Sequence, residues 1–406
     1  MANFLITLFL GPFGVHQFIK GEKILGIIYL CTFGLFGIGW LVDIIAAFND
    51  MKADNMNIPN NSVSTTKSSG TPYDAILLFW KKHPQVFQNI TDYKDATSNE
   101  YLLYGKTLIL WGFDKARPLP SDYPCYFEGE CHISNPLNLQ SSLVKQGYIS
   151  KAPTKAILFS YTIPKLKMIA DSIGCSKKGN KAELVDQVYS SLSTTDLENI
   201  YDASNLYILS DKGFSFLNEN YDYVNLHKHW KYNISLSEYN KRRFCGNKKR
   251  TFNDTAYTIL SERVYSKMAS FNYYNLNQDY FALYEIAFSE GRYDLALNYY
   301  LQFLYLKSCC IFEITLYNPS IHISVRSFEH TIIFTSHDAP VLSKLAKYYD
   351  SVQVDNIYNQ FNQPPSFFEI NVFKQMIQEM LTEIIFDYEK YNKLIRNELK
   401  AYVSLL

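Results

Sequence analysis

The chain lacks net charge. Its 406 residues contain 39 lysines and arginines and 39 aspartates and glutamates. No overall field therefore draws it to a polyanion, and any nucleic-acid binding must come from a local basic cluster. The length predicts roughly two to four domains, each with an ordinary hydrophobic core.

The sequence also lacks the short motifs of common catalytic sites. It contains no P-loop, no nucleophile elbow, no dinucleotide fingerprint and no well-spaced pair of metal ligands. The histidines are scattered, and His227 and His229 beside Trp230 come nearest to a cluster. A site assembled from distant residues is the alternative, but we expect a protein that is not an enzyme and needs no cofactor.

Cysteines are few and irregularly spaced. There are 7, an odd number, which does not suit a disulfide framework and favours a reducing compartment. Cys125, Cys131 and His132 come closest to a metal site, but no second ligand pair completes it. We therefore expect ordinary buried thiols and no metal.

Two apolar runs stand at the amino terminus, Phe4–Ile19 and Ile24–Phe48, separated by Lys20–Lys23. The second is long enough to cross a hydrocarbon core of about 30 Å with some tilt. No basic stretch precedes the first, which argues against a cleaved signal peptide. The pattern predicts a transmembrane hairpin of two helices over residues 1–50, in contact with the lipid bilayer.

Glycines within these runs would let the two helices approach closely in lipid. Folded about the turn, His16 and Asp43 fall at opposite ends, so we expect interfacial groups; a proton or ion path is the alternative. The stretch resembles the TM2 domain family. The residues of the hairpin that carry this resemblance include Gly11, Gly14, His16, Gly37, Gly39, Trp40 and Asp43.

Two arguments about orientation disagree. Lys20 and Lys23 favour a cytoplasmic turn, whereas the free cysteines and the basic module described below favour a cytoplasmic body. We expect a multi-pass protein of the cell membrane, with two spans and a cytoplasmic body.

Residues 51–72, rich in Asn, Ser and Thr, predict a disordered tether.

After the tether we expect an α-rich, irregular domain over residues 73–157. Gly147 should lie just past a helix end, where a positive φ is least costly for glycine. Residues 158–195 then predict a module of two short helices. Thr162 is a candidate N-cap of the first and Gly174 its end, while Asn180 and Glu183 form a capping-box pattern for the second.

The polar side of this module is basic. Its lysines lie at the start of the first helix and in the turn before the second, where a helix N-terminus suits a phosphate. The module resembles the SAP domain family of helix–extended–helix modules associated with DNA binding. The resemblance is carried by the Gly179-x-Lys181-x-Glu183-Leu184 core and implies DNA contacts from Lys167, Lys178, Gly179 and Lys181. The residues proposed for DNA binding are Lys165, Lys167, Lys177, Lys178, Gly179 and Lys181.

Two alternatives stay open for this module: a helix pair that merely packs within a larger fold, or a site for a protein partner. The segments flanking it look like those of bacterial, often phage-associated, SAP-domain proteins of Firmicutes. Residues 196–253 predict a winged-helix-like or mixed segment that ends in a basic run. That run could form a second phosphate patch or a solvated loop; its members are Lys241, Arg242, Arg243, Lys248, Lys249 and Arg250.

Residues 254–406 predict a helical scaffold, with a tetratricopeptide-like helix pair over Tyr280–Leu306. The expected fold is therefore mainly α: a transmembrane hairpin, a flexible linker and a predominantly helical body that contains the SAP-like module. We expect a membrane-anchored protein that holds DNA backbone. The alternative is a membrane-anchored scaffold whose carboxyl-terminal helices bind a protein partner.

Overall fold

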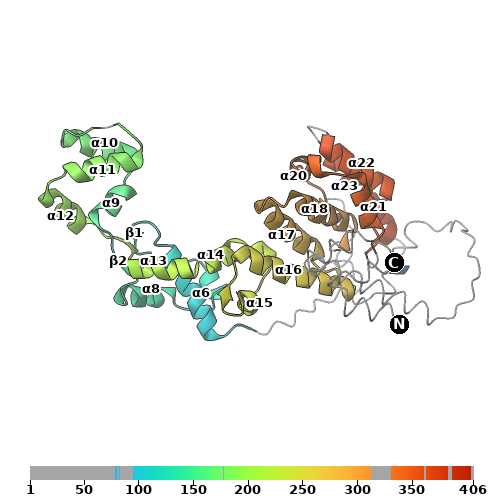
Figure 1. Ribbon diagram of the computed structural model, residues 1–406, viewed down its shortest axis with the longest axis horizontal. Helices are drawn as coiled ribbons and strands as arrows, with labels where there is room; N and C mark the ends of the chain where they lie inside the picture. The colour runs from blue at the N-terminus through green and yellow to red at the C-terminus, as the bar shows by residue number, and fades with distance from the viewer. Residues whose placement is uncertain are drawn as a thin grey trace, which may run out of the picture. The chain divides into compact units, whose positions relative to one another are not determined.

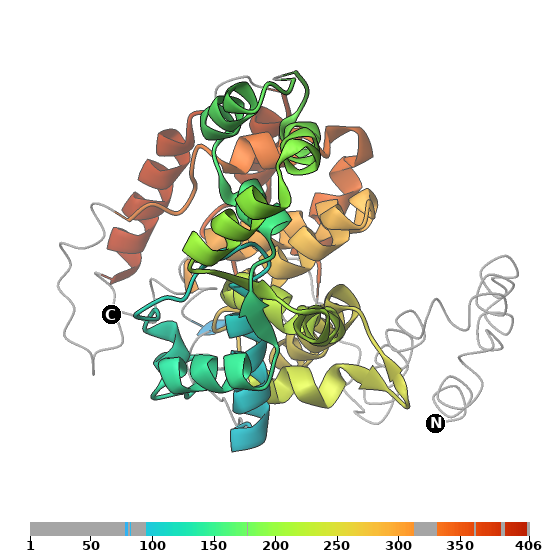
Figure 2. The ribbon, with the colours of Figure 1, turned by 90° about the vertical axis from the view of Figure 1, so that its left-hand side faces the viewer.

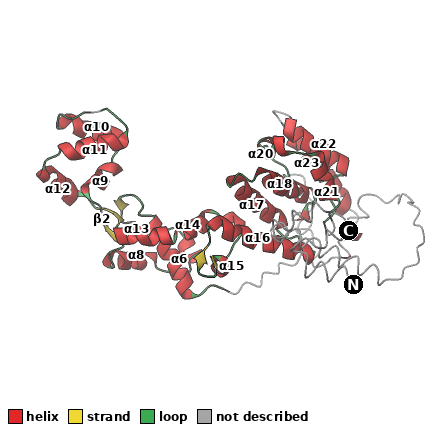
Figure 3. Cartoon of the chain, in the orientation of Figure 1, coloured by secondary structure: helices red, strands yellow, loops and turns green. Residues whose placement is uncertain are grey.

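The computed structural model describes residues 78–79, 82, 95–176, 178–311, 331–360, 363–382 and 386–403. The predicted hairpin and tether lie outside these ranges. The described part is mainly helical, as the sequence predicted (Figure 3). Within it, no helix combines the length and the apolar character that a membrane span requires.

The elements follow one another as labelled in Figure 1. Before the predicted module come α6 (Ser98–Trp111), β1 (Arg117–Pro118), α7 (Tyr126–Gly129), α8 (Pro136–Lys145) and β2 (Ile149–Lys151). The next four helices are α9 (Thr154–Ser160), α10 (Ile163–Ser172), α11 (Lys181–Ser191) and α12 (Thr194–Ala203). Then follow β3 (Leu206–Leu209), α13 (Asp211–Glu219), α14 (Tyr221–Lys228), η3 (Trp230–Tyr232), α15 (Leu236–Arg242), β4 (Phe244–Cys245) and β5 (Lys248–Lys249).

The rest is helical, with α16 (Phe252–Ala269), α17 (Leu276–Ser289), α18 (Tyr293–Ser308), α20 (Asp338–Ser343), η5 (Ala346–Tyr348), α21 (Ser351–Tyr358), α22 (Ile370–Thr382) and α23 (Tyr388–Val403). The helix pair predicted over Tyr280–Leu306 is present as α17 and α18, which pack against each other. Gly291, at φ +72°, lies between them, and Ala287 and Ala296 are fully buried.

One large hydrophobic core runs from α6 to α23. The sequence divided this region into segments 73–157, 196–253 and 254–406, but side chains from all three share that core. Many of them are tyrosines. Tyr223, Tyr239 and Tyr300 are fully buried, and their hydroxyl groups donate to Asn240, Asp222 and Asp338. Burial raises the pKa of Tyr223 to about 12, so the phenol stays protonated.

A small sheet interrupts the helices, with strand order β1-β3-β2. Both pairs are antiparallel, and Ile149 lies opposite Leu209 while Lys151 lies opposite Tyr207. Gly147, at φ +72°, follows α8, which confirms the predicted helix end and turns the chain into β2. β2 and β3 are neighbours in the sheet. The segment of chain between them therefore begins and ends at adjacent positions of the sheet.

Candidate nucleic-acid interface

The four helices α9 to α12 form an insertion between β2 and β3, here called the inserted module (residues 152–205). Its stem is closed by the backbone N–H of Ala152, which donates to the carbonyl oxygen of Leu206 over 2.8 Å. The module has a hydrophobic core of its own, made by Leu158, Leu166, Ala170, Leu184, Val185 and Val188. The predicted range was 158–195; α9 begins before it and α12 ends after it, and Leu158 of α9 belongs to this core while Ile200 of α12 packs against it.

The first predicted helix of the module is α10. Thr162 Oγ1 accepts from the backbone N–H of Lys165, and Pro164 lies in the first turn, where its missing N–H costs nothing. Leu166 and Ala170 face the core. Gly174, at φ +68°, ends the helix, so both predicted ends are confirmed.

The second predicted helix is α11, which lies beside α10 (Figures 1 and 2). Asn180 Oδ1 accepts from the N–H groups of Ala182 and Glu183 over 3.0 and 3.1 Å. Glu183 Oε2 in turn accepts from the N–H of Asn180 over 3.0 Å, which confirms the predicted capping box. Leu184, Val185 and Val188 form the buried face.

The turn between these helices is held by local hydrogen bonds. The N–H of Lys178 donates to Ser176 Oγ over 3.2 Å, and Gln187 Nε2 donates to the carbonyl oxygen of Lys178 over 3.4 Å. Gly179 adopts φ +113°, a conformation that L side chains rarely adopt. These contacts, together with the capping box, hold the described backbone from Lys178 to Lys181.

The capping box changes how an anion could bind here. Two N–H groups at the start of α11 already donate to Asn180, and the Glu183 carboxylate adds a negative charge nearby. The free helix N-terminus that the sequence suggested is therefore largely occupied. Attraction of a phosphate rests on the lysine side chains instead.

Most of those lysines face solvent. Lys165, Lys167 and Lys178 are exposed and Lys181 is half-buried, whereas Lys177 lies outside the described residues. Lys165 Nζ lies 3.4 Å from the centre of the Tyr161 ring. Within the described ranges, Lys167, Lys178 and Lys181 form no ion pair with a carboxylate. These three ammonium groups are available to an external anion.

The predicted second patch falls on α15 and the hairpin β4–β5. Gly246, at φ +58°, opens the two-residue turn of that hairpin, and Cys245 pairs with Lys248. Arg242 Nη2 lies 2.7 Å from Glu262 Oε2, and Arg250 Nη1 donates to Thr258 Oγ1 over 3.2 Å.

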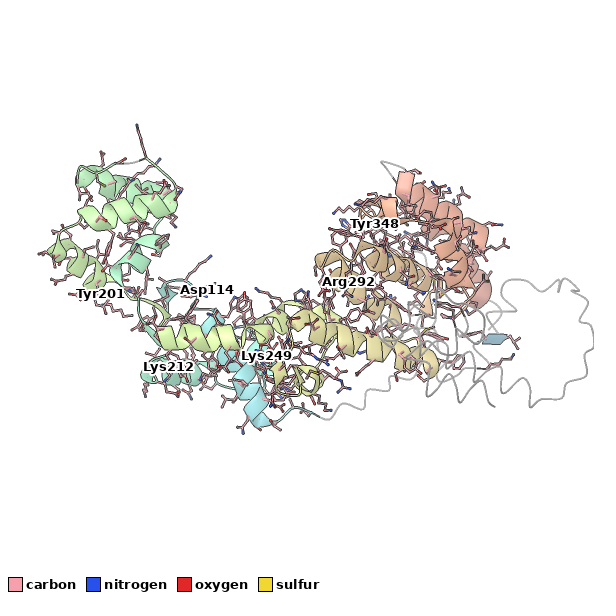
Figure 4. All side chains as sticks on the ribbon, in the orientation of Figure 1. Asp114, Tyr201, Lys212, Lys249, Arg292 and Tyr348 are labelled. Atoms are coloured by element: carbon pink, nitrogen blue, oxygen red, sulfur yellow. The ribbon has the colours of Figure 1, made fainter. Side chains whose placement is uncertain are left out.

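The buried carboxylate of Asp222 on α14 organises this hairpin. Arg243 Nη2 lies 2.9 Å from Asp222 Oδ2, and Lys249 Nζ lies 2.7 Å from Asp222 Oδ1 (Lys249 is labelled in Figure 4). Tyr239 donates its hydroxyl proton to Oδ2 over 3.0 Å. The Asp222 side chain is only 7% exposed, so these partners compensate for burying its charge.

The prediction of a six-residue basic surface is therefore wrong for Arg243, which is buried and paired with Asp222. Lys249 shares the same carboxylate, and Arg242 is paired with Glu262. Lys241 and Lys248 are the two members of the run that are exposed. Sequence reasoning missed Asp222. One signal in the sequence could have revealed this contact. An acidic residue stands among the aromatic residues of α14, and a basic run follows about 20 residues later.

The two histidines of the predicted cluster are separated. His227 Nδ1 lies 2.9 Å from Glu130 Oε2, and the hydroxyl of buried Tyr104 donates to the same carboxylate. His229 instead stacks on Phe252, with ring centres 5.0 Å apart. Within the described part, Cys125, Cys131, Cys175, Cys245, Cys309 and Cys310 form no disulfide. Burial raises the pKa of Cys131 and Cys309, which keeps both thiols protonated.

The predicted hairpin residues Gly11, Gly14, His16, Gly37, Gly39, Trp40 and Asp43 lie outside the described residues. Comparison with known proteins addresses that part of the chain, because residues 1–45 match the family of the TM2 domain. A TM2 domain-containing protein of Dictyostelium discoideum is 35% identical over 78 residues, which cover 18% of this chain and 57% of that protein. A second such protein of the same organism is 37% identical over 69 residues, covering 16% of this chain and 44% of that protein.

The chain thus spans about half the length of these curated relatives, 57% and 44%. No solved structure matches the chain. The family match begins at the first residue and ends just before the predicted boundary at residue 50. Residues 1–45 are therefore a TM2 domain, as their resemblance to that family predicted.

Proposed function

We propose that this protein is anchored in a membrane and holds the backbone of DNA through the inserted module, which we interpret as SAP-like. The observation that carries the proposal is the turn before α11. There Lys178 and Lys181 flank a glycine whose conformation is fixed, and neither lysine pairs with a carboxylate of the described chain. Lys167 on α10 adds a third exposed ammonium group.

The membrane anchor is proposed from the TM2 domain. Its two apolar runs suit a hairpin of two transmembrane helices, which would return the body to the side on which the chain starts. The free thiols of the body favour the reducing, cytoplasmic side. Anchoring would restrict the module to a shell near the membrane and so raise the local concentration of its basic turn.

Binding of this kind depends on salt. Each phosphate neutralised by a lysine releases condensed counterions, which gives a slope of about −0.9 per contact for log K against log salt. The contacts would fix the position of the duplex without reading its bases. We therefore expect little preference for sequence, and weaker binding at higher ionic strength.

The test uses the full chain in mild detergent and a fluorescent DNA duplex, titrated at several salt concentrations. In the variant Lys178→Glu/Lys181→Glu we expect binding to be lost at every salt concentration. The matched control is Lys344→Glu/Lys393→Glu, which makes the same charge change on two other exposed lysines and should bind as the parent chain does. Equal binding by the two variants, or no binding by the parent at low salt, would refute the proposal.

A second candidate is a membrane-anchored scaffold for proteins. It is favoured by apolar side chains exposed in the carboxyl-terminal part, such as Ile332, Val352 and Leu394. In that case chemical crosslinking in cells would recover a protein through the carboxyl-terminal helices. Substituting Val352 or Leu394 by aspartate would abolish the crosslink, while the Lys178→Glu/Lys181→Glu variant would retain it.

A further inference from the structure

A large polar groove lies between η3, α15, α16 and the start of α17. It has a volume of about 1030 Å³ and is open to solvent. We call it the Trp230 groove, because the Trp230 side chain on its edge is 69% exposed. An indole so exposed gains little from burial in the chain itself. Lys231 Nζ lies 6.0 Å from the centre of its ring, and the rest of the indole is accessible to a partner.

The floor of the groove is rigid and electrically balanced. Asp279, only 3% exposed, lies 2.9 Å from Arg263 Nη1 and 2.6 Å from Lys267 Nζ. Glu238 Oε2 lies 3.3 Å from Arg263 Nη2. Burial lowers the pKa of Lys267, although the neighbouring Asp279 opposes that shift. The two cations, Arg263 and Lys267, are balanced by the carboxylates of Asp279 and Glu238. The floor of the groove therefore has little net charge, and its side chains are held in fixed orientations.

Arg263 also fixes the turn that carries Trp230. Its Nη1 donates to the carbonyl oxygen of Tyr232 over 3.2 Å, and its Nη2 donates to that of Asn233 over 3.0 Å. The N–H of Asn233 donates back to the carbonyl oxygen of Trp230 over 3.0 Å, which closes η3. Tyr232 is buried beneath. The backbone that carries the exposed indole is therefore held in place before any ligand binds.

The rim is positive. Lys231 and Lys241 are exposed, and within the described ranges neither forms an ion pair with a carboxylate. Arg242 is matched by Glu262 at 2.7 Å. Lys231 interacts electrostatically with Glu285, and Lys241 with Glu100, at distances longer than an ion pair. Neither glutamate lines the groove. A ligand in the groove would thus meet two cations beside an aromatic face.

The walls supply neutral hydrogen-bonding groups. Asn233, Asn275 and Gln278 line the groove, and each carboxamide both donates and accepts. Asn275 adopts φ +54° and is the N-cap residue directly before α17. An exposed indole, cations for phosphates and carboxamides for base edges match what a single strand of nucleic acid presents. An acidic peptide would use the cations but not the indole face.

Resting on the proposed function, we propose that the Trp230 groove binds an unpaired strand of nucleic acid, with a base stacked on Trp230 and phosphates beside Lys231 and Lys241. The inserted module and the groove then have different preferences. The module holds duplex backbone, whereas the groove takes bases that are already unstacked.

The experiment compares three probes on the full chain in mild detergent: fluorescent oligothymidylate, fluorescent duplex and polyglutamate. Trp230→Ala should weaken oligothymidylate binding by roughly 5- to 150-fold, which is the usual effect of removing one stacking aromatic group. Trp230→Phe keeps a ring and should retain most of the binding. Tyr265→Ala, which removes a 49% exposed ring of α16 outside the groove, is the control and should bind as the parent does.

The two proposals fail separately. Lys178→Glu/Lys181→Glu should lose the duplex but keep the Trp230-dependent binding of oligothymidylate. If the parent binds duplex but no oligothymidylate at low salt, or if Trp230→Ala binds oligothymidylate unchanged, the groove proposal is wrong and the proposed function stands. Polyglutamate binding as tight as oligothymidylate binding, retained in Trp230→Ala and lost in Lys231→Glu/Lys241→Glu, would assign the groove to an acidic peptide and overturn the assignment to nucleic acid.

Discussion

The carboxylate of Glu183 occupies the space beside Gly179 in which any other residue would place its β-carbon. A β-carbon built on Gly179 would lie 2.3 Å from Glu183 Oε2, and the glycine has φ +113°. Gly179→Ala must therefore strain the backbone and displace Glu183 from its capping bond to Asn180. We expect a loss of about 1–3 kcal/mol from the stability of the module, measured by hydrogen exchange in residues 154–203.

The control for that substitution is Gly174→Ala in the same module. Gly174 also has a positive φ, +68°, but no atom lies within 4 Å of the position that an added β-carbon would take. This change brings backbone strain without a clash and should cost about 1–2 kcal/mol. If the two variants lose the same protection from hydrogen exchange, the contact between Gly179 and Glu183 has no role in holding the turn.

Local signals were sufficient to predict the two helices of the module. Thr162, Gly174 and the Asn180–Glu183 pair act within four residues of their own position, so capping rules alone locate the helix ends. Gly147 was predicted for the same reason, since many helices end in a residue of positive φ and glycine adopts that conformation at the least cost. Such features depend on the chain nearby and not on the rest of the fold.

The features that sequence reasoning missed are non-local. The pairing of Ile149 with Leu209, which makes the module an insertion, joins strands separated by four helices. Asp222 meets Arg243 and Lys249 only after α14, α15 and the hairpin have packed. A basic run shows how many cations are present, but not which of them a buried carboxylate neutralises. The Trp230 groove likewise needs η3 and α17 to come together.

Substitution of Asp222 should lower the stability of the protein more than substitution of most other polar residues in the large core. Asp222→Asn would leave Arg243 buried without its counter-charge, and we expect a loss of about 3–5 kcal/mol in the free energy of unfolding. Glu262→Gln is the matched control, because it removes the partner of the more exposed Arg242 and should cost at most about 1 kcal/mol. Thermal denaturation followed by circular dichroism measures both. A small, equal effect would mean that the hairpin does not depend on this carboxylate.

The inserted module should lose its structure independently of the large core. Leu166 is fully buried among the few side chains of the module's own core. Leu166→Ala should cost about 2–5 kcal/mol, a large share of what so small a core provides. Hydrogen exchange should then increase across residues 154–203 and stay unchanged in α17 and α18. Leu304→Ala, in the large core, should give the opposite pattern. Spread of the Leu166→Ala effect into α17 would show that the two cores unfold together.

Acid should weaken the contact between α22 and α23. Lys390 Nζ lies 2.7 Å from Glu379 Oε1. Burial alone would raise the pKa of Glu379, but hydrogen bonds from Lys390, Tyr391 and Gln375 outweigh it and lower that pKa below 4.5. A carboxyl group with a lowered folded-state pKa stabilises the fold above its unfolded pKa, and this stabilisation is lost as the pH falls through the folded value.

Lys390→Met keeps the aliphatic stem and removes the charge. It should lower the free energy of unfolding by about 0.2–1 kcal/mol at neutral pH, since Lys390 is partly exposed. The difference from the parent chain should disappear below the folded pKa of Glu379, where the carboxyl group is protonated in both. Lys393→Met, an exposed position on the same helix, is the control and should show no such dependence. Denaturant unfolding at neutral pH and at a series of acidic pH values distinguishes these outcomes. A Lys390→Met effect of equal size across the whole pH series would mean that lost packing, and not the ion pair, is responsible.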